Sequence, residues 1–190
     1  MSHKQRIVSL SAFALVLAVS QGSAQAQVVK PFEISGGGPA PAGISLIPDV
    51  PAIHYATGHA TELGRYSCVG MFQLLGYNSA TVATFSSAPY CVFIAEDGDV
   101  LACTYGVVGN GADGPGVVTL SPAGGGSFTA RFVAEFNPVP ALCTGRFAKV
   151  TGGSFLMIAN SAPFSIVGTQ TSPFTYTWEG KGSLTFTEEK

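Results

Sequence analysis

Charge is scarce in this sequence. Only 11% of its 190 residues are Asp, Glu, Lys or Arg, and the formal net charge is −2. Lys and Arg form no cluster after the first few residues, so the chain offers no basic face to the phosphates of a nucleic acid. We therefore expect no nucleic-acid partner.

Motifs for metal, nucleotide and hydrolase chemistry are also missing. No cysteine or histidine has the CxxC or CxxH spacing of a zinc site, and no GxSxG is present. The stretch CTGRFAKVTGG fails the phosphate-binding pattern GxxxxGK[ST], because Val150 stands where the second glycine is needed. His54 and His59 would point to opposite faces of an extended strand, so they cannot chelate a metal together. We expect no metal, no cofactor and no catalytic residue.

No apolar run is long enough to cross a membrane. Residues 7–19 are almost entirely apolar, but a helical span needs roughly 20 such residues. They follow the basic residues Lys4 and Arg6 and precede the small-residue sequence AQA, an arrangement typical of a secretory signal peptide. We predict a signal peptide at residues 1–26, cleaved after Ala26, a secreted or periplasmic location, and no membrane anchor after cleavage.

Four cysteines are present, and in an exported chain disulfides are the usual state of such residues. The sequence AEDGDV indicates a hairpin; if its loop is residues 96–98, Cys91 lies directly opposite Cys103. Opposed residues are close enough for a disulfide, so we predict Cys91–Cys103 and, by subtraction, Cys68–Cys143. A two-residue loop would break the first pairing, and four buried thiols are the alternative.

Helical periodicity is absent, whereas turn signals recur throughout the chain. From Phe174 to Phe186, aromatic or small residues alternate with polar ones, which predicts a strand with one buried face. Gly180 and Gly182 within it predict a bend or bulge, and residues 129–136 alternate likewise. We predict further strands at residues 53–61, 65–75, 79–86, 90–95, 99–108, 116–120 and 154–159.

Residues 27–50 contain a glycine triplet and Pro-Ala-Pro but no sustained periodicity. This composition predicts a flexible N-terminal segment. Residues 51–190 form the predicted domain, whose eight or nine short strands indicate an all-β sandwich or a closed barrel.

Three stretches resemble a bacterial group of secreted barrels that are similar in fold to plant allene oxide cyclases and dirigent proteins. GHATELGRYSCVG resembles the G-x-A-T-x-L-G-R-F opening of that group, FIAEDGDVLACTYG its F-x-A-x-x-G-D-x-L hairpin, and CTGRFAKVTG its G-G-T-G-R-F-A-x-x-T-G segment. Leu142 and Cys143 depart from the pattern, in which two glycines are usual. The resemblance covers about residues 53–187 and implies a single antiparallel β-barrel of eight strands, or nearly so.

Inward-facing aromatic residues are the candidates for the lining of a cavity that takes a small hydrophobic ligand: Phe132, Phe136, Phe174, Tyr176 and Trp178. The same residues can equally fill a small barrel solidly. If Tyr176 and Trp178 are buried, the polar tip of each needs a hydrogen-bond partner.

The stretch CTGRFAKVTGG is interpreted as the segment that closes one end of the barrel. Phe147 is the expected plug, with its ring buried inside. Arg146 is expected to pair with the acidic side chain of Glu62, and Cys143 to tie the segment to Cys68.

These features favour a non-enzymatic binding or structural module with an apolar interior. The alternative is an isomerase or cyclase acting on a small hydrophobic substrate inside the barrel, as the resemblance to proteins that steer a reactive intermediate implies. Such chemistry needs an inward acidic or polar group, whereas Glu135 and Glu179 fall on the polar sides of their strands. A third possibility is association through a sheet edge or an exposed aromatic patch; the oligomeric state is left open.

Overall fold

The computed structural model describes residues 26–106 and 114–188. The expected signal peptide lies outside these ranges except for Ala26. Within them, no helix is long and apolar enough to cross a membrane. The described chain is all-β, with two short 3₁₀ turns. Its elements are β1 (Gln27–Ala40), β2 (Ala52–Ala60), β3 (Gly64–Tyr77), β4 (Val82–Ala95), β5 (Val100–Tyr105), β6 (Gly116–Gly124), β7 (Ser127–Pro138), η1 (Pro140–Leu142), η2 (Gly145–Phe147), β8 (Val150–Ser161), β9 (Phe164–Val167), β10 (Gln170–Thr171) and β11 (Phe174–Thr187).

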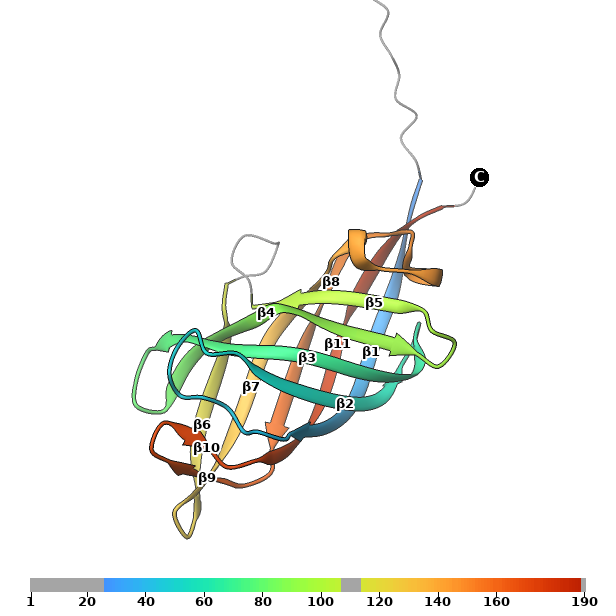
Figure 1. Ribbon diagram of the computed structural model, residues 1–190. Coiled ribbons are helices and arrows are strands. Elements are labelled where there is room, and N and C mark those ends of the chain that lie inside the picture. The colour runs from blue at the N-terminus through green and yellow to red at the C-terminus, as the bar shows by residue number, and fades with distance from the viewer. Residues whose placement is uncertain (1–25, 107–113, 189–190) are drawn as a thin grey trace, which may run out of the picture.

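The strands form one antiparallel sheet that closes on itself (Figure 1). The order β7-β5-β4-β3-β2-β1-β11-β8 returns to β7 through a β7–β8 ladder, so eight strands make a ring. Both β5 and β6 lie between β4 and β7. Each of these two longer strands pairs with β5 along one part of its length and with β6 along another. The β9–β10 hairpin lies at one end of the ring, and the η1–η2 segment lies at the other.

The predicted strands are present in the described residues, with ends that differ by a few residues. Residues 107 and 108 of the predicted strand 99–108 lie outside the described ranges. Residues 79–86 and 90–95 fall largely in a single strand, β4, whose first half pairs with β6 and whose second half pairs with β5. The predicted three-residue hairpin is confirmed, because Cys91 is the register partner of Cys103 and the Ala95 amide donates to the Asp99 carbonyl at 2.9 Å.

The sequence predicts a bend or a bulge at Gly180 and Gly182, and the bulge is absent from the pairing with β8. That ladder runs in continuous register through both glycines, and its irregularity lies between Thr185 and Phe186.

The prediction of a flexible segment at residues 27–50 is corrected by β1. This strand pairs with β11 along its whole length and with β2 over four residues, and it buries Phe32 and Ile34. Neighbouring atoms leave no room for a side chain at the glycine triplet: backbone atoms lie beside Gly37 and Gly38, and backbone and side-chain atoms lie beside Gly36. A Cβ on Gly36 would lie 2.5 Å from the Tyr66 hydroxyl and 3.0 Å from the Trp178 ring nitrogen.

The cysteine pairing predicted from the hairpin is also corrected. All four cysteines are buried and free, so neither Cys91–Cys103 nor Cys68–Cys143 is present as a disulfide. The two sulfurs that approach each other are those of Cys68 and Cys91, at 3.2 Å. Correct register places Cys91 opposite Cys103, but the Cys91 side chain turns toward the diagonal neighbour on β3 instead.

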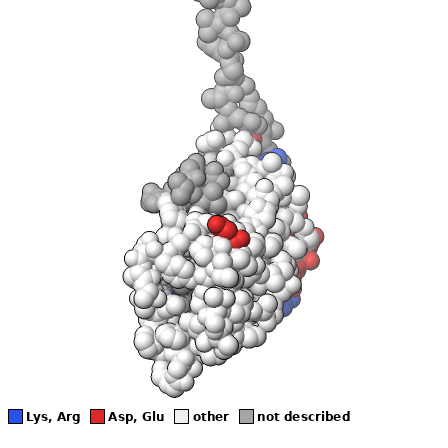
Figure 2. Space-filling view, turned by 60° about the vertical axis from the view of Figure 1, so that its left-hand side comes forward, with Lys and Arg blue, Asp and Glu red and all other residues white. Residues whose placement is uncertain are grey.

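The outer surface carries few charges, as the face in Figure 2 shows. Outward positions of β11 are filled mainly by Thr and Ser. Exposed apolar side chains are present as well: Tyr55 and Val69, each 40% exposed, are register partners on β2 and β3.

The η1–η2 segment covers one end of the ring and inserts Phe147 into the interior. The Phe147 ring is fully buried, as the plug hypothesis requires, and its centroid lies 6.4 Å from that of Phe186 on β11. Two backbone hydrogen bonds hold the segment in place, from the Thr144 amide to the Val100 carbonyl and from the Val139 amide to the Ala102 carbonyl.

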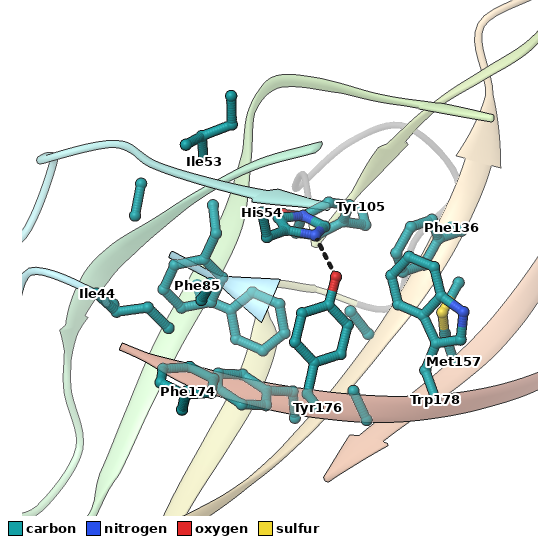
Figure 3. A pocket seen from close by; sticks show the side chains of 16 residues that line it. Ile44, Ile53, His54, Phe85, Tyr105, Phe136, Met157, Phe174, Tyr176 and Trp178 are labelled. Carbon is teal, nitrogen blue, oxygen red and sulfur yellow. Dashed lines mark hydrogen bonds between the residues drawn. The ribbon is translucent and has the colours of Figure 1, made fainter. Parts of the chain in front are cut away.

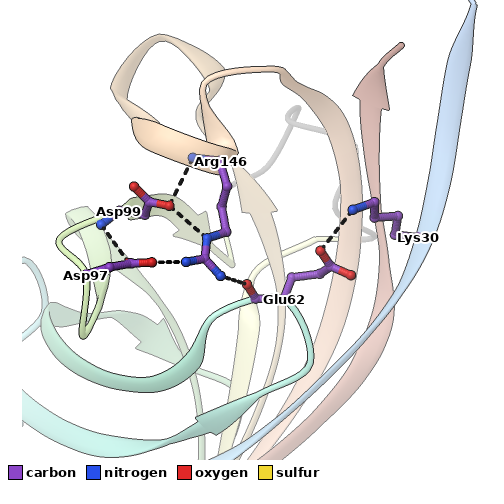
Figure 4. A network of polar contacts seen from close by, with 5 residues as sticks. All are labelled: Lys30, Glu62, Asp97, Asp99 and Arg146. Atoms are coloured by element: carbon purple, nitrogen blue, oxygen red, sulfur yellow. Dashed lines mark hydrogen bonds and ion pairs between the residues drawn. The ribbon is translucent and has the colours of Figure 1, made fainter. Parts of the chain in front are cut away.

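Arg146 anchors the same segment, but not through the Glu62 carboxylate (Figure 4). Its side chain pairs with Asp97 and, at 2.7 Å, with Asp99 of the β4–β5 hairpin, and it donates to the Glu62 backbone carbonyl at 3.1 Å. The Glu62 carboxylate binds Lys30 instead. Hydrogen bonds from Arg146 hold the pKa of the Asp99 carboxyl below its ordinary value. The acidic tip of the β4–β5 hairpin thus binds the η1–η2 segment.

Replacing Phe147 by Ala should lower the free energy of unfolding by about 3–5 kcal/mol, because it removes a fully buried ring and leaves a cavity. Chemical denaturation measures the change. Leu142→Ala, in the same segment but 41% exposed, is the control and should change stability by about 0.5 kcal/mol or less. Equal effects of the two substitutions on the free energy of unfolding would contradict the role of Phe147 as a plug.

Candidate functional site

An apolar cavity of about 70 Å³ lies inside the ring (Figure 3). We call it the His54 cavity, after the polar residue in its wall. Strands from all round the ring contribute to it, and no polar atom is exposed on its inner surface. Its lining residues are Ala40, Ile44, Ala52, Ile53, His54, Phe72, Phe85, Tyr105, Phe132, Ala134, Phe136, Met157, Ala159, Phe174, Tyr176 and Trp178.

The structure places all five of the predicted lining residues around this cavity. Phe132 and Phe136 come from β7, and Phe174, Tyr176 and Trp178 come from β11. They converge because β7 and β11 both pair with β8, and because alternate residues of a strand share one face.

Most of the interior is filled by aromatic rings rather than open. Phe136 stacks on Phe155 at a centroid distance of 5.2 Å, and Phe32 lies 4.7 Å from Phe155. A second void, of about 30 Å³, shares the walls Ile44, Phe72 and Phe132 with the His54 cavity. Aromatic rings thus fill much of the interior, and open space remains beside them at the His54 cavity and the second void.

His54 is the polar centre of the cavity wall. Its Nδ1 lies 2.7 Å from the Tyr176 hydroxyl, and its Nε2 lies 3.3 Å from the Tyr105 hydroxyl. The Tyr176 hydroxyl donates to the Tyr55 carbonyl at 2.9 Å, so it accepts a hydrogen bond from Nδ1–H. The neutral tautomer protonated on Nδ1 fits this arrangement.

Tyr105 then has one hydrogen for two acceptors. Its hydroxyl donates to the Met71 carbonyl at 2.8 Å, and the unprotonated Nε2 of His54 faces the same oxygen at the longer distance of 3.3 Å. The Nε2 lone pair of His54 therefore has the weakest hydrogen bond of the polar groups in the cavity wall.

Burial keeps these groups neutral. Desolvation lowers the pKa of His54 to about 4, and it raises the pKa values of Tyr105 and Tyr176 above their ordinary range. At neutral pH the three side chains form an uncharged hydrogen-bonded group, because a charge here would lose its hydration without gaining an opposite charge.

Gly70 provides the space for the His54 ring. The two residues are register partners on β3 and β2, and a Cβ on Gly70 would lie only 2.2 Å from His54 Nε2. The sequence offered no signal for this relation, since a single histidine opposite a glycine has no motif.

The polar groups of Trp178 and Tyr66 form their hydrogen bonds away from the cavity. The Trp178 ring nitrogen donates to the Tyr66 hydroxyl at 2.7 Å, and that hydroxyl donates to the Ser35 carbonyl at 3.0 Å. The cavity, which Trp178 lines and Tyr66 does not, consequently meets only the apolar body of Trp178.

The cavity wall is apolar, and its one imidazole is hydrogen-bonded to hydroxyl groups. No carboxylate lines it, and the nitrogens of His54 turn toward tyrosine hydroxyls. Among the residues that the structure describes, no group of three or more His, Cys, Asp or Glu side chains could hold a metal ion. A larger groove of about 540 Å³, between the end of β7 and the start of β8, has no titratable side chain in its lining.

No family model, curated protein or solved structure matches this chain.

Acidification from pH 6.5 to 4 should destabilise the protein through His54. The unfolded histidine takes up a proton near pH 6.5 and the folded one only near pH 4, so lowering the pH through this window favours the unfolded state. The loss is at most about 3 kcal/mol. Urea unfolding between pH 7.5 and 4 measures it, with His54→Gln as the comparison; equal pH slopes in the two proteins would exclude His54 as the cause.

Gly70→Ala should lower the free energy of unfolding by about 1–3 kcal/mol, because the added methyl group overlaps the His54 ring. The effect should largely vanish in a His54→Ala background, which a double-mutant cycle measures. Gly76→Ala is the matched control, because it lies on the same strand and its added methyl group would meet no atom within 4 Å. An undiminished cost in the His54→Ala background would contradict the contact.

Proposed function

We propose that this protein is an exported, non-enzymatic binding module: a β-barrel of the allene oxide cyclase-like type that takes a small apolar ligand in the His54 cavity. The observation that carries this proposal is a void inside the ring whose exposed inner surface has no polar atom. An apolar ligand there forfeits no hydrogen bond, and its transfer from water is favoured by the hydrophobic effect.

Two features support the barrel and its export. Eight strands form a closed antiparallel ring, and a ring of this size leaves room for inward side chains or one small ligand. The first strand begins at Gln27, directly after the expected cleavage point, so removal of the signal peptide would leave the ring intact.

The isomerase or cyclase alternative is less well supported. It needs an acid or a base that reaches the substrate, whereas the His54 nitrogens contact the Tyr105 and Tyr176 hydroxyls and Glu135 and Glu179 do not line the cavity.

The ligand must be small, or the wall must yield to it. The void of about 70 Å³ is roughly half the size of an engineered cavity of about 150 Å³ that binds benzene. Ile44 and Ile53 lie toward one end of the cavity, away from Trp178 and Met157 (Figure 3), and both are partly exposed. Their movement is the simplest way to enlarge the space.

Bromoalkanes test the proposal, because bromine quenches tryptophan fluorescence on contact and the only tryptophan, Trp178, lines the cavity. We expect saturable quenching by short bromoalkanes, weakened at least about tenfold by Ala134→Leu, a loss of about 1.4 kcal/mol. Ala159→Leu is a second filling variant, and the exposed Ala80→Leu is the control. Quenching that does not saturate, or that is equal in all four proteins, would refute the proposal.

A further inference from the structure

The four cysteines occupy neighbouring positions across three strands and the closing segment. Cys68 is on β3, Cys91 on β4, Cys103 on β5, and Cys143 directly follows η1. All four are buried, with at most 7% of their surface exposed. Cys91 is adjacent to both Cys68 and Cys103, so strand register alone does not decide which sulfur it meets.

The side chains of Cys68 and Cys91 converge on the inner face of the β3–β4 pair. Cys68 is opposite Phe93 and Cys91 is opposite Gly70, so the two cysteines are diagonal neighbours. Their sulfurs lie 3.2 Å apart. A diagonal pair of this kind can be bridged if the side chains shorten that distance to the S–S bond length of about 2.05 Å.

Cys143 lies against β5, not against β3. Its sulfur is 3.7 Å from the carbonyl oxygen of Ala102, which belongs to the peptide unit that joins Ala102 to Cys103. The following amide, of Thr144, is fixed to the Val100 carbonyl at 2.9 Å. Cys103 is the cysteine of this strand. Burial raises the pKa of its thiol, and the Cys143 thiol is near enough to contribute to that rise.

We propose that the oxidised protein contains two disulfides, Cys68–Cys91 and Cys103–Cys143. Each bond forms when two thiols transfer two electrons and release two protons to a disulfide oxidant, either a protein disulfide or oxidised glutathione, which is reduced to two thiols. This pairing is independent of any ligand in the His54 cavity.

The bonds must form before the ring closes. Burial raises the pKa values of the Cys91 and Cys103 thiols, which suppresses the thiolate that attacks an oxidant. Exchange is therefore expected while the strands are still open. Cys68–Cys91 then joins two strands of the wall, and Cys103–Cys143 ties the segment that carries Phe147 to β5.

Peptide mapping tests the pairing. The reduced, denatured full chain is refolded with reduced and oxidised glutathione and digested with pepsin at low pH, where disulfides do not exchange and cleavage at aromatic residues and leucines separates the four cysteines. We expect Cys68–Cys91 and Cys103–Cys143 peptides and no free thiol. A Cys91–Cys103 or Cys68–Cys143 peptide, or four free thiols, would overturn the proposal.

Three double variants provide an independent readout by thiol titration in denaturant after the same refolding. Cys68→Ala/Cys91→Ala and Cys103→Ala/Cys143→Ala each remove one complete bridge, so both should show no free thiol. Cys91→Ala/Cys103→Ala leaves Cys68 and Cys143, which the proposed pairing does not join, and should show two free thiols per chain. No free thiol in this third variant, or two in either of the others, would contradict the pairing.

Discussion

Closure of the ring is the constraint on which the rest of the structure depends. Once β7 pairs with β8, all inward side chains share one enclosed interior. Their combined volume must fit the space that eight strands leave. Large aromatic side chains fill much of this interior, and in places they fit only because a glycine leaves the space. Gly36 and Gly58, which are register partners, both leave room for the Tyr66 hydroxyl.

The polar residues inside the ring obey the same constraint. His54, Tyr105 and Tyr176 are tolerated because each hydroxyl finds a backbone carbonyl and the imidazole finds the hydroxyls. Buried groups of this kind cost free energy unless they are hydrogen-bonded. Their mutual bonding also turns the polar atoms away from the cavity, so the group fixes the shape of the wall without changing its apolar character.

Period-two alternation made much of the fold predictable. It located β7 and β11 and placed Phe132, Phe136, Phe174, Tyr176 and Trp178 on inward faces. It did not reveal β1, because three successive glycines interrupt the alternation there and give the strand the composition of a linker. His54 was missed because its role depends on Gly70 and Tyr105, which come from other strands. The cysteine contacts were missed because register defines opposed residues and not the rotamer that turns a sulfur to a diagonal neighbour.

The pairing of β1 with β11 has a consequence for how the chain acquires its structure. Gln27 lies opposite Thr187, so the first strand of the ring needs the last one as its neighbour. Contacts of such large sequence separation form slowly, because the intervening chain must first lose its freedom. A nascent chain cannot complete the ring until β11 has emerged. If the chain is exported, as we propose, the late arrival of β11 keeps the polypeptide open during its passage across a membrane, with its thiols accessible.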